Sequence, residues 1–335
     1  MRIAIDAMGG DAGPGVIVEG ALDALRNGNR DLELVLVGDE EALRREIEIR
    51  DGTSLPVTLI HADEEVSMSA SPTEAIRRKS SSIAVALSLH KEGKTQAFVS
   101  TGNTGAVVAN SLLSLGRLRS VRRPAIATFL PTAAEGCVML DVGANATVKA
   151  QNLVEFGRMG TVYARHILKR PNPRVGLLNI GEEESKGNEV AQEAYRLLTA
   201  SSLNFVGNVE GRGIFHGDVD VVVCDGFVGN ILLKFMESVL GMVKTLAKKQ
   251  IARDKRARFG AFLLKPLFAG LAEQLNYEEY GGAPLLGVNG VCIICHGSSS
   301  PRAIRNAIRV ASDFVRNGLT EEIDREAAGD TVVTE

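Results

Sequence analysis

The sequence predicts an α/β fold with helices on both faces of a mostly parallel sheet. Short runs of apolar or β-branched residues recur along the chain, and amphipathic stretches separate them, which is typical of alternating strands and helices. Several of the runs are apolar at successive positions, as expected of strands that are buried on both faces. Six of the runs end in glycine with small polar or acidic residues, which indicates a polar crevice at the strand ends.

The expected strands lie at 2–6, 33–38, 57–61, 96–100, 125–130, 137–141, 174–180, 203–208, 219–224 and 291–296. The expected helices include 14–27, 73–92, 150–168, 187–199 and 301–317. Because no composition shift marks a boundary, residues 1–318 are expected to form one compact catalytic unit, with two lobes around a cleft as the alternative. Residues 319–335 are predicted to be a solvated acidic tail.

The composition is that of a globular protein, since 45% of the 335 residues are hydrophobic and 24% are charged. A net charge of −3 argues against binding to nucleic acid. Four cysteines in a chain of this length do not make a disulfide framework, and the first residues carry no export signal. The sequence contains no long uninterrupted apolar stretch, so no membrane-spanning helix is predicted. These features together indicate a cytoplasmic protein.

The six strand ends that carry glycine are the candidates for a substrate site. They read AIDAMGGD, FVSTGNTGA, MLDVGAN, LLNIGEE, VVCDGFVGN and IICHGSSS. Glycine lets backbone N–H groups approach a ligand, and residues 102–105 open an apolar helix whose N-terminus suits an anion. The candidate contacts to phosphate or substrate are Asp6, Gly9, Gly10, Gly102, Thr104, Gly105, Asn145, Asn188, Asn230, Gly297 and Ser298.

Further residues at these strand ends are candidates for catalytic groups, and they are Asn103, Lys186, Asp225 and His296. Lys186 is either a solvated lysine or an anion contact, and His296 is either a site residue or an ordinary capped histidine. Asp6, Asp141 and Asp225 each end a strand, where capping, catalytic contact and metal binding are the alternatives.

Several familiar motifs fail on context. The segment 93–95 reads Gly-Lys-Thr, but it precedes a strand and lacks the spacing of a P-loop, and no nicotinamide fingerprint follows the first strand. Cys292, Cys295 and His296 spell a haem-attachment pattern, but they lie in an apolar strand whose residues three apart point to opposite faces. We therefore expect no metal and no cofactor.

Read in order, the strand-end strings resemble those of the PlsX-type phosphate acyltransferases of bacterial phospholipid synthesis. They run from AIDAMGGDAGP through GNTGA, DVGAN, VGLLNIGEEESKGN, GNVEGR and DVVVCDGFVGN to NYEEYGGAPLLGVNGVCIICHGSS, within residues 1–317. The resemblance implies a three-layer α/β/α sandwich similar to isopropylmalate dehydrogenases and phosphotransacetylases, assembled as a homodimer. It also implies transfer of a long-chain acyl group from acyl carrier protein to inorganic phosphate. The acyl phosphate would then pass to a membrane glycerol-3-phosphate acyltransferase.

This chemistry needs no nucleophile from the enzyme. Phosphate is itself the nucleophile, and a thiolate leaves readily because a simple thiol has a pKa of about 8.5. What the reaction needs is an anion cradle and donors to the oxyanion of the tetrahedral intermediate, which glycine-rich strand ends supply as backbone amides. The alternatives are a β-decarboxylating dehydrogenase, which would need a metal triad, and a non-catalytic membrane adaptor, which leaves the glycine strand ends unexplained.

The segment 244–272 combines a run of Lys and Arg with an apolar tip. Asp254 is the acidic residue within this segment, and the next acidic residue is Glu273. The tip residues are Phe259, Phe262, Leu263, Leu264, Leu267 and Phe268. We predict that a protruding helical segment at about 240–276 brings this tip to an anionic membrane surface, so that the protein associates peripherally with the membrane. A dimer interface is the alternative for the tip.

Overall fold

The computed structural model describes residues 1–27, 31–274 and 277–328, and it centres on a sheet of 11 strands. The strands are β1 (Arg2–Asp6), β2 (Glu33–Gly38), β3 (Val57–His61), β4 (Ala97–Ser100), β5 (Ala125–Leu130), β6 (Cys137–Leu140), β7 (Val175–Leu178), β8 (Phe205–Val209), β9 (Val221–Val223), β10 (Ala283–Leu286) and β11 (Cys292–Ile294). Their order across the sheet is β3-β2-β1-β4-β11-β10-β5-β6-β9-β7-β8.

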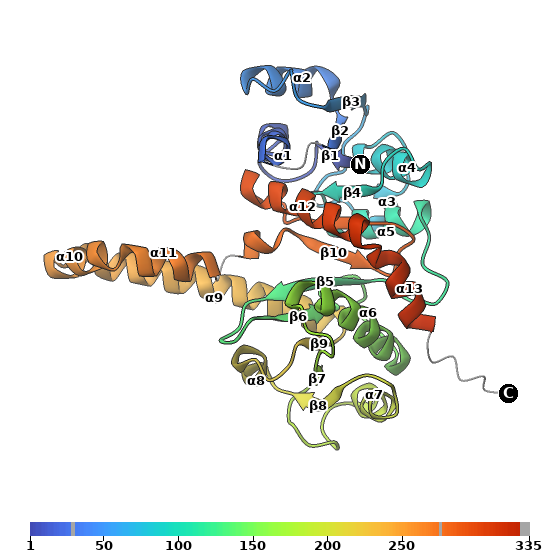
Figure 1. Ribbon diagram of the computed structural model, residues 1–335, viewed down its shortest axis with the longest axis vertical. Coiled ribbons are helices and arrows are strands. Elements are labelled where there is room, and N and C mark those ends of the chain that lie inside the picture. Colours follow the sequence, from blue (N-terminus) through green and yellow to red (C-terminus); the bar gives the residue numbers. More distant parts are fainter. Residues whose placement is uncertain (28–30, 275–276, 329–335) are drawn as a thin grey trace.

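Helices cover both faces of this sheet, which confirms the predicted three-layer α/β/α sandwich (Figure 1). The helices are α1 (Pro14–Asn27), α2 (Glu40–Ile49), α3 (Pro72–Ala75), α4 (Ser82–Lys91), α5 (Thr104–Ser114), α6 (Ala150–Leu168), α7 (Glu189–Thr199), α8 (Gly211–His216), α9 (Gly226–Arg253), α10 (Lys255–Leu263), α11 (Lys265–Gln274), the 3-10 helix η1 (Tyr277–Tyr280), α12 (Pro301–Asn317) and α13 (Leu319–Ala328).

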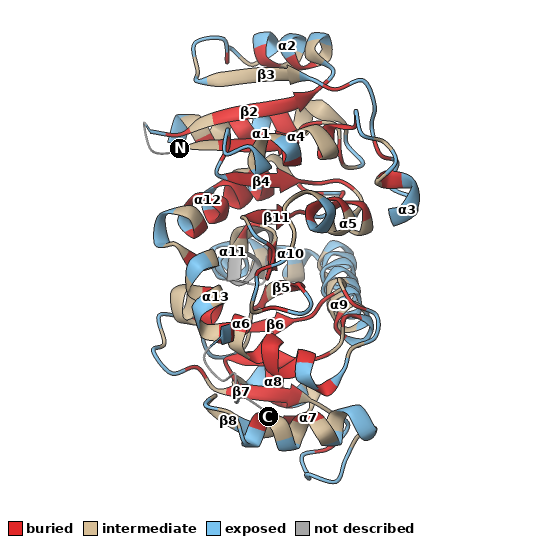
Figure 2. Cartoon of the chain, turned by 90° about the vertical axis from the view of Figure 1, so that its right-hand side faces the viewer, coloured by how far each residue is buried: buried red, intermediate tan, exposed pale blue. Residues whose placement is uncertain are grey.

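Alternate residues of the strands enter two separate hydrophobic cores. In β1, Ile3 and Ile5 belong to the core to which α1, α6, α12 and α13 contribute, whereas Ala4 belongs to the core on the other face, which includes residues of α4, α5 and α8. Figure 2 shows the result as buried strands between half-buried helices. The strands are apolar at successive positions because both of their faces are covered.

The two halves of the sheet run in opposite directions, which the sequence did not reveal. The strands β1, β2, β3, β4 and β11 are mutually parallel, and so are β6, β7, β8 and β9. Antiparallel pairings of β11 with β10, β10 with β5, and β5 with β6 join the halves. The carboxyl ends of the two sets of strands therefore lie at opposite edges of the sheet.

Three details differ from the sequence-based expectations. The strand β10 was missed because its four residues include Pro284 and lie between glycines. The expected helix 73–92 is two helices, α3 and α4, because the Ser81 side chain caps a new helix at Ser82. The predicted acidic tail is wrong for residues 319–328, which form α13 and bury Leu319 and Ile323 against the core.

A long arm leaves the body of the molecule at α9 (Figure 1). The first part of α9 packs Leu232, Leu233 and Met236 against the core, and the rest of the helix is exposed and packs with α10. By length and composition α9 is apolar enough to cross a membrane, with a mean hydropathy of 1.4 over its best window. The expectation of no such helix was wrong because it considered only uninterrupted apolar runs.

Candidate active site

A cavity of about 500 Å³ lies on the face of the sheet that α5 and α9 cover. It is lined by the loops after β4 and β11, by Val142 and Gly143 after β6, and by Ile126 and Thr128 of β5. Asp11 reaches it from the loop after β1, and Asn230 from the loop and helix after β9. Five of the six glycine-bearing strand ends thus contribute to one cavity, which spans the face of the sheet rather than following one edge.

The loops after β1, β4 and β11 form the tightest part of this cavity. The N–H of Asp11 donates to the carbonyl oxygen of Gly297 at 2.8 Å. A Cβ atom at Gly9 would lie 2.6 Å from the backbone nitrogen of Gly102, so a larger residue does not fit there. Gly10 has φ of +89° and faces Gly297 and Thr101. Backbone from three distant segments therefore approaches as closely as glycine allows.

Asp6 lies beneath these turns and is fully buried. Its carboxylate accepts hydrogen bonds from the Ser100 hydroxyl at 2.6 Å and from the N–H of Met8 at 3.2 Å. Burial raises the pKa of Asp6, against the effect of these hydrogen bonds. These contacts indicate that Asp6 orients the loops and does not contact phosphate directly.

The start of α5 carries free backbone donors. The side chain of Asn103 caps the helix, because its Oδ1 accepts from the N–H of Ala106 at 2.9 Å, and its Nδ2 donates to the carbonyls of Met68 and Ala70. Asn103, predicted to be catalytic, therefore has its amide occupied within the protein. The N–H groups of Thr104 and Gly105 have no partner among the described residues and lie at the cavity. Free N–H groups at a helix N-terminus suit an anion, so Thr104 and Gly105 remain candidates for contact with phosphate.

His296 also lines the cavity. Its Nδ1 accepts from the N–H of Ser298 at 3.2 Å and lies 2.7 Å from the Ser298 hydroxyl. Because Nδ1 is the acceptor, the neutral ring carries its proton on Nε2, which is thereby available as a donor. Ser298 positions the histidine and does not itself line the cavity.

Four residues of α9 line the cavity, of which three are polar, and only one of these three was predicted. Asn230, Lys234 and Glu237 have a spacing of i, i+4 and i+7, which places them on one face of the helix. Lys234 has no ion pair among the described residues, so its charge is available to an anion. That helical spacing within an apolar segment is the signal by which the sequence could have identified Lys234.

The remaining predicted residues lie outside this cavity. Lys186 is exposed on the loop after β7, 3.9 Å from Glu183, and Asn188 caps α7. Asp225 caps α9 by accepting from the N–H groups of Phe227 and Val228. The amide of Asn145 is buried and donates to Asp141 and to the carbonyl of Pro124. Asp225 and Lys186 thus show the capping and the solvated alternative, and the contacts of Asn145 and Asn188 are likewise within the protein.

Asp141 is the clearest case of a structural carboxylate at a strand end. It is fully buried and accepts hydrogen bonds from the N–H groups of Ile126, Gly143, Ala144 and Asn145, as well as from the Asn145 side chain. These five contacts hold the loop after β6, including Gly143, against the cavity.

Residues 1–322 match a family model described as fatty acid synthesis protein. The chain belongs to this family. A relative in the family, the phosphate acyltransferase of Heliobacterium modesticaldum, is 50% identical over 331 residues and covers 98% of each chain. The phosphate acyltransferase of Desulfitobacterium hafniense (strain DSM 10664 / DCB-2) is 50% identical over 328 residues, with 97% of each chain covered.

The fold of the chain is similar to the folds of phosphotransacetylases whose structures have been solved. A phosphotransacetylase from Streptococcus pyogenes superposes with a TM-score of 0.62 and 18% identity over 94% of each chain. The EutD phosphotransacetylase from Staphylococcus aureus gives 0.58 and 14% over the same share of each chain. At these identities the likeness shows the fold alone, in agreement with the predicted architecture.

Proposed function

We propose that the protein transfers a long-chain fatty acyl group from acyl carrier protein to inorganic phosphate, by direct attack of phosphate on the thioester. The names of its curated relatives support acyl transfer to phosphate, and the family description supports a place in lipid synthesis. The observation that carries the proposal is the cavity at the start of α5, which is lined by Thr104 and Gly105, with their free N–H groups, and also by Lys234 and His296.

In this mechanism, phosphate binds at the α5 amides and Lys234, where the helix terminus and the cation stabilise its negative charge. A phosphate oxygen attacks the thioester carbonyl carbon and forms a tetrahedral oxyanion. The C–S bond then breaks, the acyl phosphate forms and the thiolate leaves. His296 Nε2–H is positioned to donate to the oxyanion or to the leaving sulfur.

The described cysteines are poor candidates for a covalent intermediate. Burial raises the pKa of Cys137, Cys292 and Cys295 to about 12, and it raises the pKa of Cys224 as well. A thiol with so high a pKa carries little thiolate at neutral pH and is a weak nucleophile. This supports phosphate as the attacking group.

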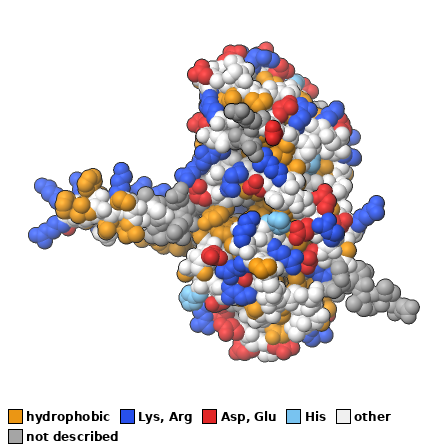
Figure 3. Space-filling view, viewed as in Figure 1, with side chains coloured by type: hydrophobic (Ala, Val, Ile, Leu, Met, Phe, Trp, Pro, Cys, Tyr) orange, Lys and Arg blue, Asp and Glu red, His pale blue; other side chains and the backbone are white. Residues whose placement is uncertain are grey.

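The arm supports the proposed cellular partners. Its end carries basic side chains beside exposed apolar ones (Figure 3), as expected of a helix that binds reversibly to an anionic membrane surface. We propose a cytoplasmic homodimer that associates with the membrane in this way. Peripheral binding would bring the acyl phosphate close to a membrane glycerol-3-phosphate acyltransferase.

The test is to mix the purified full chain with palmitoyl-acyl carrier protein and labelled phosphate and to measure labelled acyl phosphate. We expect product with no metal or nucleotide added, and none when phosphate is omitted. Thioester loss that continues without phosphate would identify a thioesterase and reject the proposal. A parallel reaction with palmitoyl-coenzyme A tests the identity of the acyl donor. A faster reaction with this donor would reject acyl carrier protein as the substrate but would still agree with acyl transfer to phosphate.

A further inference from the structure

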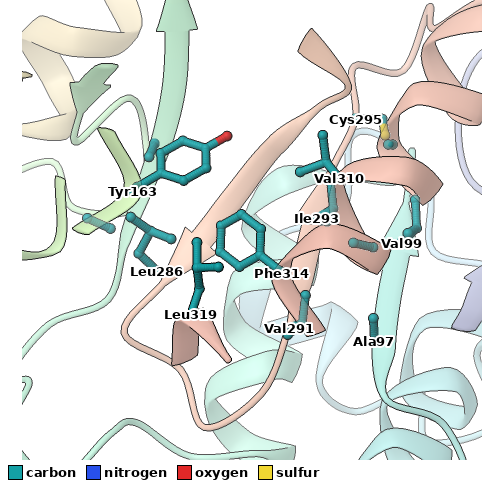
Figure 4. Close-up of a cluster of buried hydrophobic side chains, with 14 of the residues drawn as sticks. Ala97, Val99, Tyr163, Leu286, Val291, Ile293, Cys295, Val310, Phe314 and Leu319 are labelled. Atoms are coloured by element: carbon teal, nitrogen blue, oxygen red, sulfur yellow. The ribbon is translucent and has the colours of Figure 1, made fainter. Parts of the chain in front are cut away.

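A second cavity, of about 680 Å³, lies on the opposite face of the sheet, between α6, α12 and α13. Its interior is apolar and includes Tyr163, Val310, Phe314 and Leu319, which Figure 4 shows in one cluster. The rings of Tyr163 and Phe314 lie 5.3 Å apart, centroid to centroid. This volume is in the range of cavities that bind small ligands.

Most charged groups near this cavity pair with another charged group. His166 lies 2.8 Å from Glu322, and Arg309 lies 3.9 Å from Asp313. The remaining cation of the lining, Lys169, has no ion pair among the described residues but is exposed, so the buried part of the cavity holds no unpaired charge. Its chemistry fits a hydrocarbon rather than a charged metabolite.

The two cavities share a wall. Phe129 of β5 and Tyr280 of η1 line both of them, and their rings stack with centroids 3.9 Å apart at an interplanar angle of 27°. Near this pair the backbone pairing between β5 and β10 is short. It joins only Ile126 with Leu285 and Ala125 with Leu286. The stacked rings therefore fill the space where backbone pairing between the two strands has ended.

We propose that the second cavity binds the hydrocarbon chain of the acyl donor, which reaches it between β5 and β10 when the Phe129–Tyr280 stack opens. This rests on the proposed function, because it assumes that the thioester lies in the first cavity. The reacting carbonyl then stays beside the α5 amides while the chain is buried on the other face. Each buried methylene favours binding roughly fourfold, so long chains are selected over short ones.

The first test compares donors of two lengths in variants that fill the second cavity. Leu168→Trp adds bulk at a half-buried position of its lining, and Val310→Phe is a second variant in case the first does not fold. We expect kcat/KM for a palmitoyl donor to fall at least about 10-fold while that for a butyryl donor changes less than about 2-fold. Ile49→Trp, at an exposed site on α2, is the matched control, and Tyr163→Phe should keep the wild-type preference because a hydrocarbon needs no hydroxyl.

The second test measures binding without turnover. A palmitate analogue with a photoreactive group at its end should label α6 or α12 in the wild-type protein, and Leu168→Trp should reduce that labelling at least about 10-fold. Labelling confined to α5 or to the arm, or equal losses with both donors, would overturn the proposal. If no donor yields acyl phosphate but α6 or α12 is labelled, the proposed reaction fails while the hydrocarbon site stands.

Discussion

The backbone N–H of Asp11 donates a hydrogen bond to the carbonyl oxygen of Gly297 across 2.8 Å, which joins the loop after the first strand to the loop after the last. A Cβ at Gly297 would lie 2.9 Å from the Asp11 carboxylate, and one at Gly10 would lie 2.9 Å from the Gly297 carbonyl. The candidate active site is therefore built by the two ends of the folded chain, with α5 inserted between them. Its geometry depends on complete folding of the sheet.

Gly105→Val is expected to reduce acyl phosphate formation about 100-fold while leaving the fold intact. Gly105 supplies a free N–H at the cavity, and a Cβ there would already lie 3.1 Å from Pro72, so the branched side chain must displace the loop or cover the amide. Circular dichroism and steady-state kinetics provide the measurement. Gly211→Val is the matched control, because nothing lies within 4 Å of a Cβ at that position. Near-normal turnover of Gly105→Val would remove the α5 terminus from the site.

Lys234→Met is expected to raise the KM for phosphate at least about 10-fold, because it removes the cation that α9 presents to the cavity. Lys244→Met, on the exposed part of the same helix, is the control and should leave the KM unchanged. Lys186→Met is measured in parallel. A larger rise in KM at Lys186 than at Lys234 would contradict the site described here and would require the loop after β7 to close over the cavity.

Asp220→Asn is expected to lower the free energy of unfolding near neutral pH by about 2 kcal/mol, since its partners Arg170 and Arg174 are partly exposed. Burial would raise the pKa of Asp220, but its hydrogen bonds to Arg174 and the nearby charges outweigh burial and hold the pKa below its ordinary value. A carboxyl group whose pKa is lower in the folded than in the unfolded protein stabilises the fold at pH values above its unfolded-state pKa. This stabilisation is lost as the pH falls through the folded-state pKa.

Urea unfolding at several pH values checks this prediction. The difference between wild type and Asp220→Asn should shrink as the pH falls through the lowered pKa of Asp220, where the wild-type carboxylate also becomes protonated. Asp63→Asn, at an exposed acid, should show little difference at any pH. A difference between wild type and Asp220→Asn that is independent of pH would mean that packing, rather than charge, stabilises this site.

Changing Phe262, Leu263 and Leu267 together to Asp is expected to abolish co-sedimentation with anionic vesicles while leaving activity and oligomeric state unchanged. These side chains are 72%, 60% and 64% exposed, so their replacement disturbs no core contact. Shallow insertion of a few such side chains gives only reversible binding, which three charges suffice to prevent. A monomeric triple variant would show instead that the tip is an assembly interface.

A second apolar stripe on the arm is the candidate interface of the proposed homodimer and can be tested separately from the tip. Ile231, Phe235, Met242 and Leu246 recur at helical spacing along α9, and all are exposed. We expect Phe235→Asp combined with Met242→Asp to convert a dimer into a monomer, as measured by sedimentation velocity. A dimer that survives both charges would exclude this stripe as the interface.

Much of this protein followed from local pattern. Strands apolar at successive positions predicted a sheet covered on both faces, because only burial on both sides removes the polar alternation from a strand. Glycine at residues 102 and 105 predicted a helix start with free amides, because the N-terminus of a helix leaves its first N–H groups without partners. The basic and apolar arm was visible as composition alone.

Other features were decided only by the tertiary structure. Strand direction depends on the pairing of β10 with β5 and β11, and a short strand containing Pro284 gives too weak a local signal to reveal it. Asp141, Asn145 and Asp225 resemble substrate ligands in sequence, but partners within the protein occupy them. Asp225 caps its own helix, whereas Asp141 bonds to Ile126 and Asn145 to Pro124, partners that only the folded chain brings close. Lys234 lines the candidate site, whereas Lys186 lies on the surface. The sequence shows that both residues are charged, but only packing decides which of them faces the cavity.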